Sequence, residues 1–181
     1  MSGDHSASER SWPEISLPAR IGLLGDFHGS SKRQALGLFL SQARPDVLLV
    51  AGDVQDYEPW PVPMIFVRGN HEHFTTIAAL EAGTITPRNV HYLPDREIIT
   101  VAGLRIAGIG GIAHTKPGPK RIDAAASEWL SRQGGIDIVV SHDAPIHYSD
   151  GRRELTNEDL RVLAEVVAPR LWLSGHHHWF D

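Results

Sequence analysis

Cysteine is absent from the 181-residue sequence, and so is any long hydrophobic run. Without cysteine, disulfides, thiolate-held metals and thiol nucleophiles are excluded. No apolar stretch approaches the roughly 18 residues of a membrane span. The polar start, Met1 to Arg10, has no apolar signal-peptide core. We therefore expect a cytosolic, cytoplasmic location and no membrane partner.

Excess positive charge is missing as well, since the formal net charge is −5 at pH 7 with the histidines neutral. This balance argues against a broad nucleic-acid-binding face, although bound cations would change the local field of a cleft. With 41% hydrophobic residues, the chain is long enough for one domain with a substantial core. We predict a flexible leader over residues 1–18, which holds Pro13 and Pro18, and a single domain over residues 19–181.

Apolar runs and helical periodicity alternate along most of the chain. Apolar runs predict strands at residues 20–24, 46–51, 64–67, 89–93, 136–140 and 170–173. Amphipathic spacing predicts helices at residues 30–43, 75–82, 123–133 and 156–167, with Asp123 and Thr156 as N-caps. Residues 98–101 and 104–109 flank Ala102-Gly103 as a tight hairpin, which interrupts the alternation. The expected fold class is α/β with a mixed sheet arrangement, not a pure doubly wound sheet.

Metal-ligand residue types stand at the ends of five predicted strands. Asp26 and His28 follow the first, and positions i and i+2 of an ending strand point the same way. The other four blocks are Gly52-Asp53, Gly69-Asn70-His71-Glu72, Ser141-His142-Asp143 and Gly175-His176-His177-His178. Ligand crevices in open α/β sheets lie beyond the carboxyl ends of strands, so all five blocks can share one crevice.

These blocks supply more ligands than one metal ion needs. The candidates are Asp26, His28, Asp53, Asn70, His142, His176 and His178. Such a set suits two ions that share a carboxylate, and oxygen and imidazole ligands suit Mn²⁺, Fe, Zn²⁺ or Ni²⁺ better than Ca²⁺. Two ions about 3.5–4 Å apart lower the pKa of a bridging water and clamp the oxygens of a displacement at phosphorus. The sequence therefore predicts phosphoester hydrolysis.

The order of the blocks resembles that of the calcineurin-like metallophosphoesterases. Their pattern of Asp-x-His, Gly-Asp-x-x-Asp, Gly-Asn-His-Asp/Glu, a single later His and Gly-His-x-His is matched from about residue 20 to residue 178. The resemblance implies two packed mixed sheets flanked by helices, an αββα sandwich. It assigns one metal to Asp26, His28 and His178, a second to Asn70, His142 and His176, and the bridging position to Asp53.

The same resemblance implies a catalytic mechanism. His71 would not be a ligand but would protonate the leaving oxygen after attack by a metal-activated hydroxide. Asp56 would orient His71. We therefore expect residues 19–181 to form the catalytic domain of a dinuclear, metal-dependent phosphodiesterase that holds two divalent ions, Mn, Fe or Zn. Its partner would be a phosphoester substrate such as a nucleotide or a nucleic acid.

Alternatives remain open at this level. The stretches 63–72, 87–93, 101–112 and 136–143 are similar to the catalytic domain of RNA lariat debranching enzymes, which cut 2′,5′-phosphodiesters. That subfamily often has cysteine at the first aspartate, where this chain has Asp26. A phosphomonoesterase and a non-catalytic scaffold on the same fold are further alternatives.

Simpler structural roles also compete with the functional ones. Asp26 and Asp53 could be caps of turns or helices. Exposed basic residues and aromatic residues near the crevice could contact phosphate or stack a base, although solvated surface and packing are the simpler roles. These residues are Lys116, Lys120, Arg121, Arg152, Arg153, Tyr57, Trp60 and Tyr148.

Overall fold

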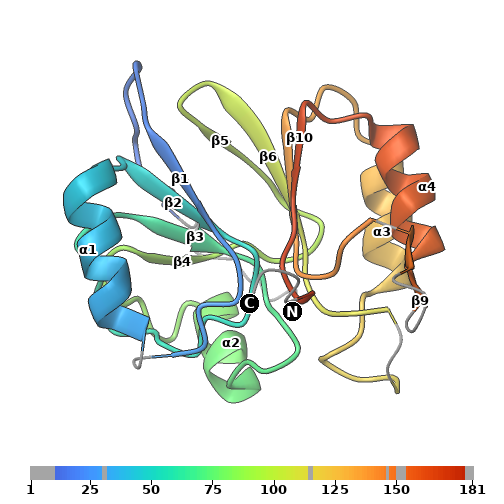
Figure 1. The fold of residues 1–181 in the computed structure, drawn as a ribbon, viewed down its shortest axis with the longest axis horizontal. Helices are drawn as coiled ribbons and strands as arrows, with labels where there is room; N and C mark the ends of the chain where they lie inside the picture. The colour runs from blue at the N-terminus through green and yellow to red at the C-terminus, as the bar shows by residue number, and fades with distance from the viewer. Residues whose placement is uncertain (1–10, 30–31, 114–115, 146, 150–153, 178–181) are drawn as a thin grey trace, which may run out of the picture.

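The computed structural model describes residues 11–29, 32–113, 116–145, 147–149 and 154–177. Its elements form two four-stranded sheets that face each other, with helices on the outer side of each (Figure 1). The helices are α1 (Arg33–Ala43), α2 (Phe74–Glu81), α3 (Ala124–Ser131) and α4 (Glu158–Val167). This arrangement confirms the predicted α/β fold with two packed sheets.

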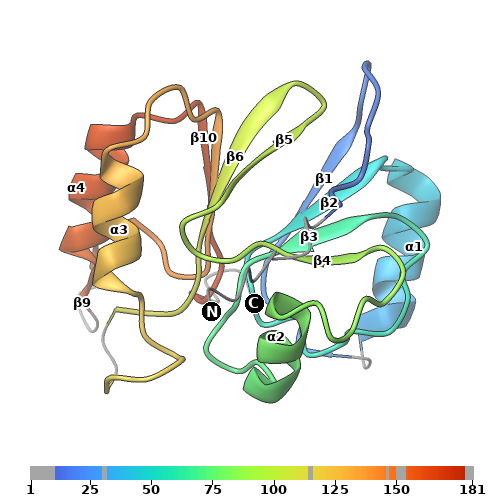
Figure 2. The ribbon, with the colours of Figure 1, turned by 180° about the vertical axis from the view of Figure 1, so that it is seen from behind.

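The first sheet is wholly parallel and has the strand order β1-β2-β3-β4. Its strands are β1 (Ile21–Leu24), β2 (Val47–Val50), β3 (Met64–Phe66) and β4 (Val90–Tyr92). The four residues of β2 are all fully buried, as expected for a strand covered on both faces. Figure 2 shows α1 on the side of this sheet that faces away from the second sheet.

The second sheet is mixed and has the order β10-β7-β6-β5. Its strands are β5 (Ile98–Val101), β6 (Leu104–Ile109), β7 (Ile138–Ser141) and β10 (Leu171–Leu173). Only the hairpin of β5 and β6 is antiparallel, and its turn residues Ala102 and Gly103 both have positive φ, 50° and 75°. The predicted hairpin is therefore confirmed. A small hairpin of β8 (His147–Ser149) and β9 (Glu154–Thr156) was not predicted.

Three hydrophobic clusters hold the layers together. Leu48 and Val50 of β2 face the cluster under α1 and α2, whereas Val47 and Leu49 face the cluster between the two sheets. A third cluster joins β6 and β7 to α3 and α4. This alternation follows from the two-residue period of a strand. A continuous apolar run such as β2 therefore packs against the helices with one face and against the second sheet with the other.

Part of the predicted leader contacts the core. Trp12 and Ile15 pack against the cluster between the sheets, and the indole N–H of Trp12 donates a hydrogen bond to Glu97 at 3.1 Å. Residues 1–10 lie outside the described part of the chain. Among the described helices, none is long and apolar enough to cross a membrane.

One predicted helix cap is wrong. The N-cap of α4 is Asn157, whose side chain accepts the backbone N–H of Leu160. Thr156 instead belongs to strand β9. The predicted cap of α3 is correct, since Asp123 accepts the N–H of Ala125 at 3.0 Å. Both residue types can cap a helix, so only the position of the first helical turn separates Thr156 from Asn157.

Candidate metal centre and active site

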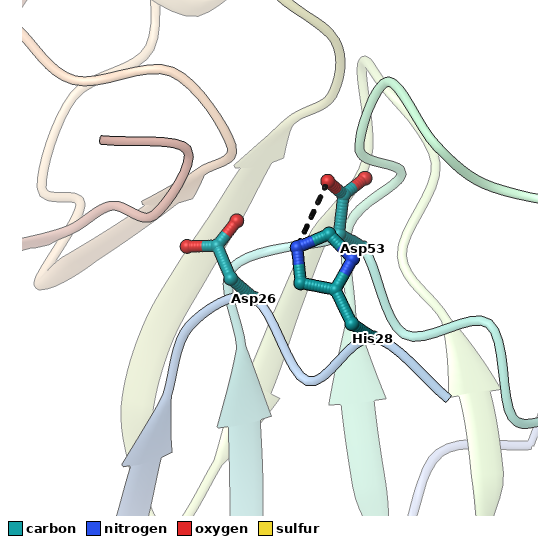
Figure 3. A group of neighbouring side chains, drawn as sticks. All are labelled: Asp26, His28 and Asp53. Atoms are coloured by element: carbon teal, nitrogen blue, oxygen red, sulfur yellow. Dashed lines mark ion pairs between the residues drawn. The ribbon is translucent and has the colours of Figure 1, made fainter. Parts of the chain in front are cut away.

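The first cluster of ligand-type side chains lies where β1 and β2 end. One ligand atom from each of Asp26, His28 and Asp53 lies within 4.8 Å of the others. Figure 3 shows these three side chains grouped together beyond the strand ends. All three residues have positive φ, 46°, 53° and 52°. Because this conformation is costly for residues other than glycine, its repetition here indicates that the fold forces these side chains into place.

Asp26 and His28 come together for a different reason than the sequence analysis expected. Strand β1 ends at Leu24, so Asp26 and His28 lie in the loop rather than on one face of a strand. The amide of His28 donates to the carbonyl oxygen of Asp53 at 2.7 Å. The loop after β1 is therefore hydrogen-bonded to the loop after β2, and this bond brings the two blocks together.

A second cluster surrounds His142, which follows β7 and is completely buried. Its Nδ1 lies 2.7 Å from the carbonyl oxygen of Ala51. Since a carbonyl only accepts hydrogen bonds, Nδ1 carries a proton, and in the neutral imidazole Nε2 then presents a lone pair. That Nε2 atom lies 2.8 Å from Oδ1 of Asn70 and 3.5 Å from Oδ2 of Asp53.

Asp53 links the two clusters. Its Oδ1 accepts the backbone N–H of His71 at 2.8 Å. Its Oδ2 lies 3.8 Å from Nε2 of His28 and 3.5 Å from Nε2 of His142. One carboxylate oxygen thus faces a histidine from each cluster, which is the arrangement needed for a ligand shared by two ions.

The donor set can be tested for its fit to metal ions. In the second cluster, with a neutral His142 protonated on Nδ1, the lone pairs of His142 Nε2, Asn70 Oδ1 and Asp53 Oδ2 face one another, and a cation between them would offset their repulsion. Donor atoms about 2.1 Å from one ion lie about 3.0 Å apart in octahedral and about 3.4 Å apart in tetrahedral coordination. The observed distances from His142 Nε2 are 2.8 Å to Asn70 Oδ1 and 3.5 Å to Asp53 Oδ2. The described residues therefore fit a divalent ion at each cluster.

The last strand brings His176 to the same place. Its backbone N–H donates to both carboxylate oxygens of Asp26, at 2.8 and 3.0 Å, and its ring centroid is 5.1 Å from that of His142. Burial, and then the neighbouring His142, lower the pKa of His176, which favours the neutral imidazole that binds metals. The predicted ligand His178 lies outside the described residues.

Two glycines allow these backbones to approach closely. A Cβ atom at Gly69 would collide with the carboxylate of Asp53. A Cβ atom at Gly175 would lie 2.7 Å from Oδ2 of Asp26. Each glycine thus leaves room for a carboxylate of the metal centre.

The predicted acid His71 is exposed and lies beside the first cluster, with its ring centroid 5.9 Å from that of His28. Asp56 was predicted to orient it. In the structure, Arg33 of α1 donates two hydrogen bonds to the Asp56 carboxylate, at 2.6 and 2.9 Å, and the Glu58 amide donates a third at 3.2 Å. The orienting role of Asp56 therefore stays a prediction, because this carboxylate is engaged by α1.

Glu72 fastens the two loops that carry Asp53 and His71. The buried carboxylate accepts the backbone N–H groups of Val54, Gln55 and Gly69 at 3.0, 3.2 and 3.3 Å, and also the hydroxyl of Tyr57. Burial, with the nearby negative charge of Glu72, raises the pKa of Tyr57, so its hydroxyl keeps the proton it donates. The sequence pattern included Glu72 but assigned it no role.

Asp143 and His177 form a pair for which the sequence analysis proposed no role. Asp143 Oδ1 lies 3.0 Å from His177 Nε2, and the carboxylate also accepts the amides of Ala113 and Ala144 and the side chain of Asn157. Burial by itself raises the pKa of Asp143, but the bonds from His177 and the two amides outweigh it and lower the pKa to about 2. The sequence did offer one sign of this pair, because Asp143, a residue type that can bind metals, directly follows the predicted ligand His142.

The other residues considered from the sequence lie at varied places. Trp60 is buried, with its ring 5.3 Å from that of Phe27, so its role is packing. Lys116, Lys120 and Arg121 are exposed. Arg152 and Arg153 lie outside the described part of the chain, as does the side chain of Tyr148.

Comparison with known proteins agrees with this geometry. The sequence profile of calcineurin-like phosphoesterases matches residues 19–180. The chain belongs to the calcineurin-like phosphoesterase family. Members of this family hydrolyse phosphoesters and bind divalent metals in a dinuclear centre, and the cluster of Asp26, His28 and Asp53 could hold one such ion.

Curated relatives of this calcineurin-like phosphoesterase include several lariat debranching enzymes. Those of Schizosaccharomyces pombe and Saccharomyces cerevisiae are 27% and 26% identical, over 88% and 86% of this chain and 48% and 49% of theirs. The enzyme of Drosophila melanogaster is 29% identical over 65% of this chain and 29% of its own length. The chain therefore spans less than half the length of these relatives.

Proposed function

We propose that this chain is a dinuclear phosphodiesterase. The observation that carries the proposal is the position of Asp53 Oδ2, which faces His28 in one cluster and His142 in the other. A carboxylate in that position can be shared by two ions, and a two-metal centre suits in-line displacement at phosphorus. The ions would be Mn, Fe or Zn, since the donors are oxygen and imidazole.

The proposed ligand assignment follows the two clusters. One ion would be held by Asp26, His28 and His178, and the other by Asn70, His142 and His176, with Asp53 shared. When bound, the ions supply an activated water and neutralise negative charge on the phosphate. The chain's own contribution is to hold these donors in place, through hydrogen bonds such as that from His176 N–H to Asp26.

His71 would donate a proton to the leaving oxygen. Its backbone is fixed by the bond from its N–H to Asp53, while its side chain is exposed and therefore accessible to a substrate. An imidazole titrates near neutral pH, which suits a general acid. The backbone of the proposed acid, His71, would thus be hydrogen-bonded to Asp53, the carboxylate that the two ions would share.

The first experiment compares bis-p-nitrophenyl phosphate with p-nitrophenyl phosphate after chelation and reconstitution with Mn²⁺. We expect metal-dependent cleavage of the diester. His71→Ala should lower kcat about 10²- to 10⁴-fold with two ions still bound, and His73→Ala is the matched control because His73 is also exposed in the same loop. Preference for the monoester would contradict the diesterase; absence of both bound metal and hydrolysis would leave a non-catalytic scaffold.

Cleavage of branched RNA is the second candidate, favoured by the relatives named lariat debranching enzymes. The test is to compare a 2′,5′-linked with a 3′,5′-linked diadenosine monophosphate under the same metal conditions. Faster cleavage of the 2′,5′ linkage would support debranching. Equal cleavage, or preference for the 3′,5′ linkage, would argue against it.

A further inference from the structure

A cavity of about 280 Å³ lies beside the loop that carries His71. Arg68 and Phe74, which precede and follow the Gly69 to Glu72 block, both line it. Along α2 the lining continues through Ile77, Ala78 and Glu81, one face of that helix. The cavity is therefore bounded by the residues on either side of the loop that carries the proposed acid, and it extends along α2.

Two segments of the chain give the walls of this cavity apolar and aromatic surface. Phe74, Ile77 and Ala78 of α2 form one wall, and Pro119, of the segment after β6, belongs to a second. The buried ring of Tyr92, which ends β4, also contributes. Flat rings bind well between surfaces of this kind.

The segment that forms the second wall is held in place by Arg68. Its Nε donates to the carbonyl oxygen of Pro119 and its Nη2 to that of Arg121, both at 3.1 Å. Its Nη1 pairs with Asp95 at 2.9 Å, and Asp95 also accepts the N–H of Gly110. The cavity is therefore preformed by a bonded network and does not depend on a ligand for its shape.

The charges around the cavity disfavour a phosphate group. Three carboxylates line it, those of Glu81, Asp95 and Asp123, against the guanidinium groups of Arg68 and Arg96. Arg68 is already paired with Asp95, and both side chains are largely buried, 11% and 15% exposed. A neutral ring with N–H donors suits such a site better than an anion does.

We propose that this cavity is the subsite for the nucleobase of the leaving nucleoside. This inference rests on the proposed function, in which His71 protonates the leaving oxygen and the leaving sugar therefore lies on its side of the phosphorus. The base attached to that sugar would enter between Phe74 and Pro119. Its amino or imino groups would donate to a lining carboxylate such as the exposed Glu81.

The test fills the cavity and measures binding of adenosine to metal-depleted protein, so that no catalysis is needed. Ala78→Trp places a large ring at the rim, and Ala78 is exposed, so the helix tolerates the change. Thr75→Trp is the matched control, since Thr75 is exposed on the same helix and does not line the cavity. We expect saturable binding of adenosine, with NMR chemical-shift changes at the amides of Phe74 and Arg96. The affinity for adenosine should be at least tenfold lower in Ala78→Trp and unchanged in Thr75→Trp.

A kinetic arm connects this subsite to the reaction. With diadenosine monophosphate as substrate, Ala78→Trp should raise KM at least tenfold and change kcat less than threefold, with Thr75→Trp equal to wild type. Lack of adenosine binding, or equal binding by both variants, would overturn the subsite even if the protein hydrolyses simple diesters. Adenosine binding that Ala78→Trp weakens, in a protein that hydrolyses no phosphoester, would instead overturn only the proposed function.

Discussion

Replacement of Glu72 by glutamine should destabilise the protein and weaken its metal binding together. The Glu72 carboxylate is 5% exposed and accepts four hydrogen bonds. In Glu72→Gln one oxygen can still accept from Val54 and Gly69, but the new amide group faces the N–H of Gln55. A buried bond to a charged group contributes about 1.5–3 kcal/mol, and the unpaired N–H adds a desolvation cost, so we expect a loss of about 2–3 kcal/mol.

Urea denaturation of the metal-free protein measures this loss, and calorimetric titration with Mn²⁺ measures the metal affinity. The affinity should fall because Glu72 fixes the loops of Asp53 and Asn70, the proposed ligands. Glu128→Gln is the matched control, since Glu128 is exposed and pairs only at the surface with Arg132; it should cost less than about 0.5 kcal/mol. Equal stability of Glu72→Gln and wild type would refute the role of Glu72 as the fastening group.

Three further predictions concern single sites. Gly69→Ala should abolish binding of at least one metal ion in titrations, because its Cβ would displace the Asp53 carboxylate; full occupancy would contradict this. Burial lowers the pKa of His91, so the stability of the protein should fall as pH drops through about 6.5, where the unfolded chain takes up the proton. In His91→Gln the midpoint of urea denaturation should therefore change less between pH 7.5 and 5.5 than in the wild type. An equal change of the midpoint with pH in both proteins would refute this prediction. Asn157→Ala should cost about 1–2 kcal/mol through loss of the α4 cap and its bond to Asp143, measured by thermal unfolding; an unchanged midpoint would argue against both contacts.

The sequence predicted elements well where a local pattern carried the information. The buried run of β2 and the turn at Ala102-Gly103 are local signals, and both are seen in the structure. The cap of α4 was misplaced by one residue, because Thr156 and Asn157 are both competent caps and the pairing of β9 takes up Thr156. The β8–β9 hairpin has no comparable local signal.

The partners of the functional side chains were less predictable. Asp56 was predicted to orient His71, and the sequence pattern gave no sign of the two hydrogen bonds that Arg33 of α1 donates to its carboxylate. The bond between Asp143 and His177 joins residues 34 positions apart, and that between Asp26 and His176 joins residues 150 apart. Such contacts depend on which strands end side by side, and no pattern within one segment contains that information.

The sequence by itself determined the chemistry available to this protein: oxygen and imidazole donors without thiolate, placed after apolar strands in a fixed order. Only the tertiary structure decided how these donors meet. Positive φ at Asp26, His28 and Asp53, and the close approaches at Gly69 and Gly175, bring the strand ends into one site with Asp53 between two histidines. The physical reason is that residue type follows from local sequence, whereas convergence requires the packing of two sheets.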